Sequence, residues 1–409
     1  MEEPIVVGID LGTTKICTLV ARIEMDRGLR ILGVGIEPSQ GIKRGNIVDI
    51  AAASQSIARS IEKAQRSSGL EITSALVSLA GSHVSSQNSK GVVGISGRTI
   101  EQDDMIRALG SAQAVDVPHG REIIHVLQRG YTVDGQNGIH VPLGMHGYRL
   151  EVEAHIITAA AANLANLREC VHSSGVSVSQ FVLNPLASGE VVLTETERQM
   201  GAIVCDIGGG TTDMAIYIDG DVWHTSVLAF GGDHITSDIA HGLRLSLAQA
   251  EEVKRQYGNA SCDTVSPSEL FTIRSFGAEA PVQVNRKELA EIIEARVEEI
   301  FEHVLQEIKR SGYDGLLPAG MVLTGGTSNL PGIRIVASRV LGLPVRLGKP
   351  ENLIGLVDQI QKPEYSTSVG LLNWTLIMHE TIPTKQGPRF KVEKKDWDRF
   401  KNFLTRLLP

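Results

Sequence analysis

The chain has few aromatic residues, few cysteines and no excess of basic charge. Its 409 residues carry a formal net charge of −8, and only 4% of them are aromatic. It therefore lacks the positive surface and the stacking side chains that general nucleic-acid binding requires. Its four cysteines are far apart in the sequence. This spacing argues against a disulfide framework or a zinc site and favours a reducing compartment.

Long hydrophobic runs are also missing. The first residues show no basic-then-apolar leader, so we expect no signal peptide. The uncharged run 171–189 is rich in serine and is broken by Pro185, which argues against a transmembrane helix. The length is sufficient for two or more domains with hydrophobic cores of their own.

One stretch, residues 203–217, combines apolar runs, two acids, three glycines and two hydroxyls in the order IVCDIGGGTTDMAIY. The pattern predicts two buried strands joined by a glycine tip, which is a β-hairpin. Glycines in such a tip leave backbone N–H groups free to converge on a phosphate chain. Asp206 is suited to holding Mg²⁺ through water. An ordinary glycine-rich turn is the alternative.

Residues 6–20 repeat this pattern as VVGIDLGTTKICTLV, with Asp10 at the position of Asp206 and Gly12 at the glycine tip. The repeat predicts two related half-molecules that grip one phosphate group from opposite sides. A Walker loop and a dinucleotide-binding glycine motif do not occur in the setting that each needs.

A third motif, MVLTGGTSNLP at residues 321–331, predicts a buried strand, a Gly-Gly turn and a helix that begins near Pro331. A further glycine pair in residues 229–243 precedes a helix, where it can approach a nucleotide or act only as a turn. With the three motifs in this order, the sequence resembles the superfamily of actin, the sugar kinases and the seventy-kilodalton heat-shock chaperones. The expected fold class is α/β, with two related domains around a nucleotide cleft and two inserted subdomains.

We expect the first actin-like domain at residues 1–81, 158–199 and 356–379, and the second at residues 200–242 and 313–355. A small α/β module is expected at 82–157, with a helix at 101–114 and strands at 123–127, 131–133 and 149–157. The second insertion is expected at 243–312, where a long amphipathic helix begins at Asn285, with capping-box spacing to Glu288, and ends at Gly312. Residues 380–393 contain prolines and a glycine without periodicity, which predicts a flexible linker.

The last stretch, residues 394–409, has two unlike faces at helical spacing. The apolar residues that recur at steps of three and four are Trp397, Phe400, Phe403, Leu404, Leu407 and Leu408. The opposite face has two aspartates and the basic residues Lys394, Lys395, Arg399, Lys401 and Arg406. This asymmetry predicts an amphipathic helix on an anionic membrane surface. A core helix, or a partner helix in a groove, is the alternative.

An actin-like body, an inserted module and a tethered amphipathic helix together resemble the FtsA family of bacterial cell-division proteins. The resemblance implies a peripheral protein on the cytoplasmic face of the inner membrane that binds ATP, forms polymers with itself and meets other division proteins. It also implies binding of the acidic C-terminal peptide of the tubulin-like protein FtsZ, with Arg286, Lys287 and Arg296 as candidate contacts or merely solvated charges. A soluble phosphotransferase similar to the sugar kinases is the competing function.

The motifs and the resemblance together assign a set of residues to ATP, with Asp10 and Asp206 also around Mg²⁺. These residues are Asp10, Gly12, Thr13, Thr14, Lys15, Asp206, Gly208, Gly209, Gly210, Thr211, Thr212, Asp213, Gly231, Gly232, Glu251, Lys254, Gly325, Gly326, Thr327 and Asn329. No catalytic residue is assigned. Relatives often carry Glu where this chain has Asn184, and an amide cannot act as a general base, so we expect at most slow ATPase activity.

Overall fold

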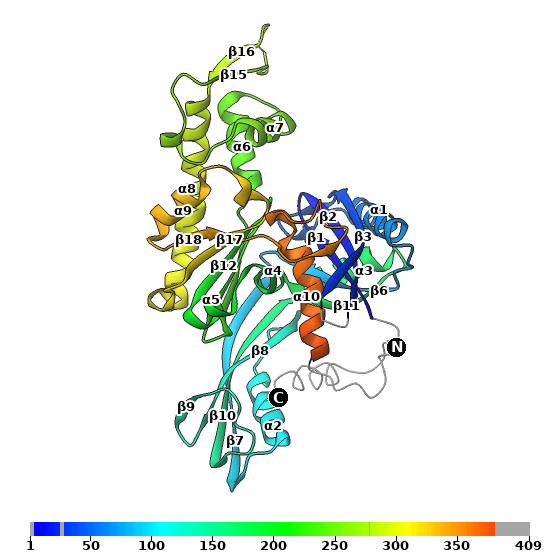
Figure 1. Ribbon diagram of the computed structural model, residues 1–409, viewed down its shortest axis with the longest axis vertical. Coiled ribbons are helices and arrows are strands. Elements are labelled where there is room, and N and C mark those ends of the chain that lie inside the picture. The colour runs from blue at the N-terminus through cyan, green and yellow to red at the C-terminus, as the bar shows by residue number, and fades with distance from the viewer. Residues whose placement is uncertain (1–3, 25–27, 278, 381–409) are drawn as a thin grey trace.

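The computed structural model describes residues 4–24, 28–277 and 279–380 (Figure 1). The predicted amphipathic helix at 394–409 lies outside these residues, as does the predicted linker apart from Glu380. Within the described ranges, no helix combines the length and the apolar character needed to cross a bilayer.

Ten α-helices and four short 3-10 helices are described. The α-helices are α1 Ile50–Ser68, α2 Gln102–Gln113, α3 Ala161–His172, α4 Asn184–Val192, α5 Glu195–Met200, α6 Gly232–Leu243, α7 Leu247–Tyr257, α8 Arg286–Ser311, α9 Ile333–Leu341 and α10 Ser366–Glu380. The 3-10 helices are η1 Cys262–Thr264, η2 Asp314–Leu316, η3 Gly326–Asn329 and η4 Pro363–Tyr365.

The strands fall into three main sheets and two small hairpins. They are β1 Ile5–Leu11, β2 Lys15–Ile23, β3 Leu29–Pro38, β4 Ile42–Lys43, β5 Asn46–Ile47, β6 Ser74–Leu79, β7 Val84–Thr99, β8 Arg121–Val133, β9 Gln136–Ile139, β10 His146–Ala160, β11 Ser177–Leu183, β12 Ala202–Ile207, β13 Thr212–Ile218, β14 Asp221–Leu228, β15 Leu270–Ile273, β16 Val282–Asn285, β17 Gly320–Thr324, β18 Val345–Leu347 and β19 Ile354–Gly355.

Two of the main sheets share one plan. Their strand orders are β11-β6-β1-β2-β3-β19 and β14-β13-β12-β17-β18. In each sheet an antiparallel hairpin, β1–β2 or β12–β13, has a parallel strand, β6 or β17, beside its first strand. A third strand, β3 or β14, pairs antiparallel with the second hairpin strand. Both predicted hairpins are confirmed, and the sequence repeat is also a repeat of topology.

The third sheet, β7-β10-β8-β9, forms the lower part of the molecule in Figure 1, where α2 packs on β7 and β10. Its strand β7 runs through 84–99, a serine- and glycine-rich segment where the sequence pattern predicted none. Thirteen of its residues have paired partners on β10. Such a segment has a low strand preference of its own, so pairing with its neighbour determines its conformation.

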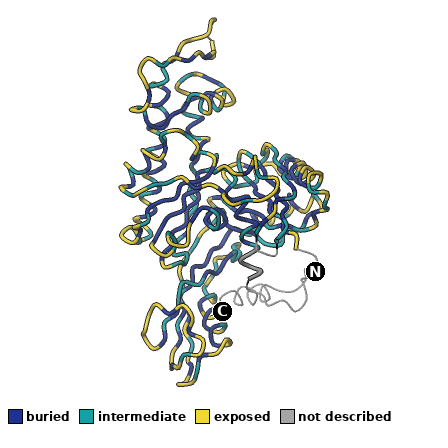
Figure 2. Tube along the Cα trace, viewed as in Figure 1, coloured by how far each residue is buried: buried dark blue, intermediate teal, exposed yellow. Residues whose placement is uncertain are grey.

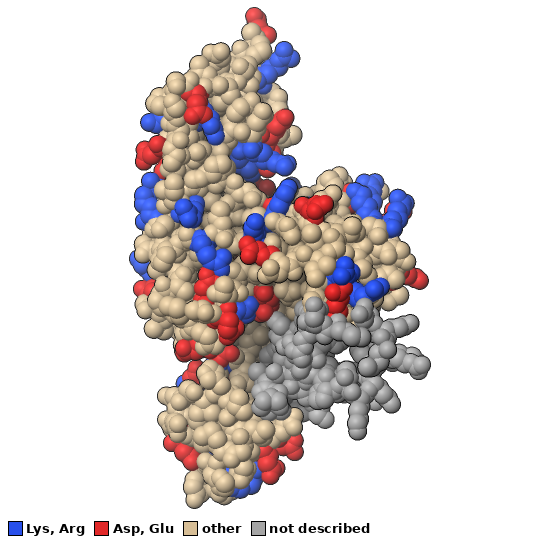
Figure 3. All heavy atoms as spheres, in the orientation of Figure 1, with Lys and Arg blue, Asp and Glu red and all other residues tan. Residues whose placement is uncertain are grey.

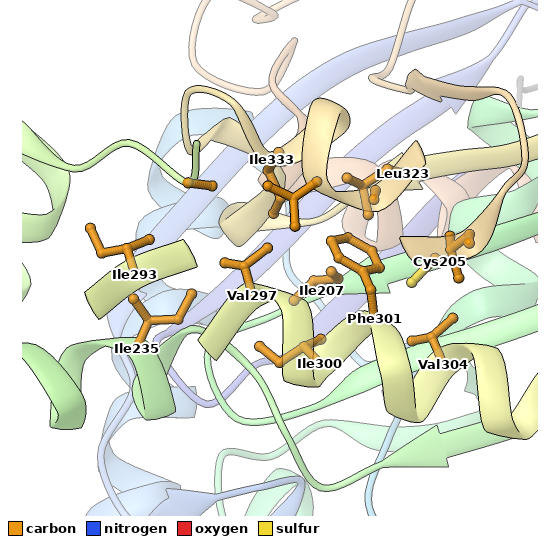
Figure 4. Packing of buried hydrophobic residues seen from close by; sticks show 14 of the residues in the cluster. Cys205, Ile207, Ile235, Ile293, Val297, Ile300, Phe301, Val304, Leu323 and Ile333 are labelled. Carbon is orange, nitrogen blue, oxygen red and sulfur yellow. The ribbon is translucent and has the colours of Figure 1, made fainter. Parts of the chain in front are cut away.

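A single apolar cluster connects the second sheet to α8. In Figure 4 the helix side chains Val297, Ile300, Phe301 and Val304 share one layer with Cys205, Ile207 and Leu323 of the sheet. Figure 2 shows the strands of both large sheets as mostly buried. Residues 286–311 therefore stabilise the same core that positions the second hairpin, since removing this apolar surface from water favours folding.

The start of α8 differs from the prediction in one detail. The expected capping box between Asn285 and Glu288 is wrong, because the Asn285 side chain accepts from the N–H of Lys287 at 2.9 Å. Its amide also donates to the carbonyl of Pro267 at 2.8 Å. Asn285 thus caps the helix alone and ties its start to the preceding loop.

Helices α4 and α10 cross closely between the two large sheets. Gly370 of α10 makes the crossing possible, because a Cβ there would lie 1.9 Å from the carbonyl oxygen of Ala187 in α4. This contact fixes the first turn of α10 near the ends of both hairpins, where the candidate site lies.

Candidate functional site

Three aspartates lie beside the glycine tips of the two hairpins. Asp10 is the penultimate residue of β1 and Asp206 that of β12, and both are buried, with 6% and 7% exposure. Asp213 pairs in register with Asp206 and is 2% exposed. In the first hairpin the corresponding partner of Asp10 is Cys17. The second half of the protein therefore contributes one more acid than the first.

Hydroxyl groups from a distant segment donate to two of these carboxyl groups. Ser368 donates to Asp10 Oδ2 at 2.7 Å, and Thr367 donates to Asp206 Oδ2 at 2.8 Å. Both donors lie in the first turn of α10, where the helix dipole also favours negative charge. One helix terminus thus contacts one acid from each half.

Burial has a large effect on two of the three carboxyl groups. Removal from water, with the charge of Asp10 adding to it, raises the pKa of Asp206 to about 6. Burial, and then the charge of Asp206, raises the pKa of Asp213 well above its usual value. Such shifts are typical of functional sites.

Two buried oxygen atoms beside the second tip have no hydrogen-bond partner among the described residues. They are Asp213 Oδ1 and Asn184 Oδ1. The two side chains are neighbours, since Asn184 Nδ2 donates to Asp213 Oδ2 at 3.4 Å. Buried polar atoms are rarely left unsatisfied, so the pair fits a site for polar ligands such as the water shell of a cation.

No cluster of three or more His, Cys, Asp or Glu side chains within the described ranges is arranged to bind a metal directly. The donor set therefore fits Mg²⁺ only when waters and phosphate oxygens complete its six-oxygen shell, which is how Mg²⁺ usually binds.

The glycine tips of the two hairpins face each other. A Cβ on Gly209 would lie 2.3 Å from Thr14 Oγ1, and one on Gly210 would lie 2.6 Å from Thr13 Oγ1. Within each tip, a backbone N–H donates across the turn, from Gly12 to Lys15 O and from Gly208 to Thr211 O. The structure therefore brings the two predicted phosphate-binding segments together from opposite halves.

The other predicted segments gather around the second tip. Thr327 of η3 donates to the carbonyl of Gly208 at 2.9 Å, and the N–H of Gly232 donates to the same oxygen at 3.0 Å. Lys254 of α7 donates to the carbonyl of Gly232 at 3.1 Å and pairs with Glu251 at 2.6 Å. These contacts place the predicted adenosine-bordering residues on the Gly208 side of the tip.

The Lys15 side chain contacts the segment that precedes α10. Its Nζ donates to the carbonyl of Glu364 at 2.5 Å and lies 4.8 Å from the ring centroid of Tyr365. The Glu364 carboxylate in turn accepts from Asn329 at 2.8 Å. Glu364 therefore links two predicted site residues, although no motif had marked it.

The residues proposed for partner contact lie on α8, and two of them already have partners within the chain. Arg286 pairs with Glu269 at 2.5 Å, and Arg296 pairs with Asp238 at 2.5 Å. On the face shown in Figure 3, basic and acidic side chains are interleaved.

No sequence motif had pointed to Thr367 and Ser368 of α10. Ser366, Thr367 and Ser368 are all at most 5% exposed, although a helix needs only one such residue as a cap. Three consecutive hydroxyl residues before an apolar helix could have indicated this contact. The two that are not needed as a helix cap require buried acceptors elsewhere, because buried polar groups are usually hydrogen-bonded.

Comparison with known proteins gives matches along most of the chain. The family model "Cell division protein FtsA" matches residues 203–370, and the model "SHS2 domain inserted in FTSA" matches residues 81–158. The cell division protein FtsA of Pseudomonas aeruginosa is 43% identical over 371 residues, which cover 91% of this chain and 89% of that protein.

Solved structures show the same fold at low identity. A PilM–PilN type IV pilus biogenesis complex matches with a TM-score of 0.65 at 17% identity, covering 91% of this chain and 98% of that one. MreB5 of Spiroplasma citri bound to ADP matches with a TM-score of 0.54 at 14% identity, covering 90% and 95%. The predicted α/β actin-like fold is thereby confirmed.

Replacing Asp206 by Asn should stabilise the protein at pH 8 and have little effect near pH 4. The pKa of Asp206 rises from 3.8 to about 6 on folding, so its ionisation opposes folding as the pH rises through that interval. The shift corresponds to about 3 kcal/mol above pH 7. Below the unfolded-state pKa the carboxyl is neutral in both states, and the advantage of Asn disappears.

Thermal unfolding followed by circular dichroism at both pH values tests this expectation. Asp358→Asn is the matched control, because Asp358 is exposed. A gain for Asp206→Asn that is equal at both pH values would contradict the assignment.

Proposed function

Because the chain belongs to the FtsA family of cell-division proteins, we propose that it binds ATP with Mg²⁺, forms actin-like polymers with itself and anchors FtsZ to the cytoplasmic face of the inner membrane. The observation that carries the nucleotide part is the pair of glycine-tipped hairpins that meet above buried aspartates. An actin-fold structure with ADP bound, MreB5, supports it.

The tips supply the phosphate-binding part of the proposal. The N–H groups of Gly12 and Gly208 donate within their turns, and the other backbone N–H groups of the tips, with the hydroxyls of Thr13 and Thr14, are donors for phosphate oxygens. The Thr211 hydroxyl donates to Asp213 Oδ2 at 2.9 Å instead. Asp10 and Asp206 hold Mg²⁺ through water, and the metal neutralises phosphate charge when it is bound. Thr327, Asn329 and the Glu251–Lys254 pair border the adenosine.

Asn184 determines the proposed rate of hydrolysis. It begins α4, and its amide lies beside Asp213, next to the tip of the second hairpin. An amide orients a water molecule but takes no proton from it, so nucleotide acts chiefly on conformation and polymer state.

Residues 394–409 supply the proposed membrane anchor. Their five basic side chains exceed the two acidic ones by three, which contributes about 3 kcal/mol on an anionic surface. Burial of the apolar face adds to this affinity, and polymer formation multiplies it, because linked anchors bind together. FtsZ and other division proteins are the proposed partners, because the chain belongs to the FtsA family. Helix α8 is the candidate contact for FtsZ.

Gly209→Val should lower the affinity for ATP and Mg²⁺ at least tenfold, since several charge-assisted hydrogen bonds are lost together. Its side chain would occupy the space between the tips, 2.3 Å from Thr14 Oγ1. Asp206→Ala should weaken binding as well. Calorimetric titration measures both, and Gly94→Val is the control, because a Cβ at Gly94 meets nothing within 4 Å. Unchanged affinity in both folded variants would exclude the phosphate site.

Steady-state phosphate release should proceed below about 0.1 s⁻¹, against roughly 1–100 s⁻¹ for kinases. The physical reason is the amide at position 184, which cannot serve as a base. A panel of sugars added to the same assay distinguishes the competing function. Turnover that depends strongly on a sugar would favour the phosphotransferase.

Trp397→Glu should release the protein from vesicles that contain anionic lipid and leave ATP affinity unchanged. The substitution puts a charge on the apolar face, whereas Trp397→Phe keeps that face and should retain binding. Co-sedimentation with vesicles measures this, and FtsZ should sediment only with variants that bind. Raising the salt concentration should weaken binding, because the net positive charge is screened.

A matched melting experiment separates the anchor from a core helix. If Trp397→Glu lowered the melting temperature by many degrees, the helix would belong to the folded body and the anchor proposal would fail.

A further inference from the structure

The turn between β4 and β5 places an arginine beside both hairpin tips. Arg44 and Gly45 form this two-residue turn, with φ angles of 49° and 74°. Turns of this kind favour Asn, Asp and Gly, and a left-handed arginine costs roughly 1–2 kcal/mol. Strain of this sort at a surface turn is a reason to look for a function of the side chain or its position.

Arg44 lies where the two halves meet. A Cβ on Gly210 would lie 3.0 Å from the Cα and from the N of Arg44, and 2.6 Å from Thr13 Oγ1. Gly208, at the other end of the same tip, contacts Thr327 and Gly232. Along the second tip, Arg44 is therefore at the end away from the predicted adenosine-bordering residues.

His234 cannot accept hydrogen bonds from both of the donors that face its ring. Arg44 Nη2 lies 3.2 Å from His234 Nε2 on α6, and the N–H of Gly231 points to His234 Nδ1 at 3.3 Å. Each ring nitrogen thus faces a donor, but a neutral imidazole has only one acceptor nitrogen. In either tautomer, the protonated ring nitrogen of His234 faces another hydrogen-bond donor.

An oxyanion would resolve this conflict, because it accepts from the guanidinium and from the Nε2–H of His234 together. Burial and the charge of Arg44 lower the pKa of His234, which keeps the ring neutral. Among the described residues, Arg44 forms no ion pair with a carboxylate. Its charge is therefore available for such a ligand.

The backbone under Arg44 is held in place. Asn46 donates to the carbonyl of Arg44 at 3.2 Å, and its own side-chain oxygen accepts from Asn163 at 2.7 Å and lies 3.2 Å from His83 Nδ1. Gly45 packs against Ala80, where a Cβ would lie 2.4 Å from the carbonyl oxygen. A pre-organised turn reduces the entropy that an anion must overcome on binding.

We propose that Arg44, with His234 as a second donor, binds the terminal phosphate of a nucleoside triphosphate and thereby distinguishes triphosphate from diphosphate. The inference rests on the proposed nucleotide binding. It adds a residue that makes the affinity depend on the number of phosphates in the nucleotide. Since Arg44 belongs to the first half and His234 to the second, the bound phosphate also joins the two halves.

Arg44→Asn tests the inference without disturbing the turn, because Asn favours a positive φ. Calorimetric titrations with a non-hydrolysable ATP analogue and with ADP, both with Mg²⁺, should show an affinity for the ATP analogue at least tenfold lower. The affinity for ADP should change less than about threefold. The melting temperature should not fall. Lys43→Asn, which removes the neighbouring exposed cation, is the control and should leave both affinities unchanged.

The outcomes separate this inference from the proposed function. A variant that keeps the wild-type preference, or that loses ATP analogue and ADP equally, would overturn the role of Arg44 while nucleotide binding stands. A wild-type protein that binds neither nucleotide would overturn both.

Discussion

The structure has to accommodate three buried carboxyl groups where its two halves meet. Asp10, Asp206 and Asp213 lie within one buried region, and isolated buried charges are costly. Hydroxyls from the first turn of α10 lower this cost for one acid of each half. The close crossing of α10 and α4 at Gly370 helps to position that turn beside both acids. The packing of α10 on α4 and the hydrogen bonding of the buried aspartates are therefore coupled.

Much of this site could be predicted because its chemistry is contiguous in sequence. Each hairpin places strand, acid, glycine tip and second strand within about fifteen residues, so local periodicity and turn preference were sufficient to predict it. The repeat of the pattern then indicated two related halves. The strand orders of the two sheets agree with that interpretation, and so does the family to which the chain belongs.

The remaining site residues depend on contacts between distant segments, which no local pattern contains. Ser368 meets Asp10 across 358 positions and Arg44 meets His234 across 190. The extended conformation of β7 likewise depends on its pairing with β10. The roles assigned to Glu251, Lys254 and the cations of α8 stay predictions, as does the membrane helix, which lies outside the described residues.

The hairpins match in strand pairing but differ in charge. Where Cys17 faces Asp10, Asp213 faces Asp206, and the cations Lys15 and Arg44 both belong to the first half. Two identical hairpins would admit an elongated anion in either direction. Divergence at a few positions of the duplicated unit removes that equivalence, so the paired tips have a polarity of their own before any ligand binds.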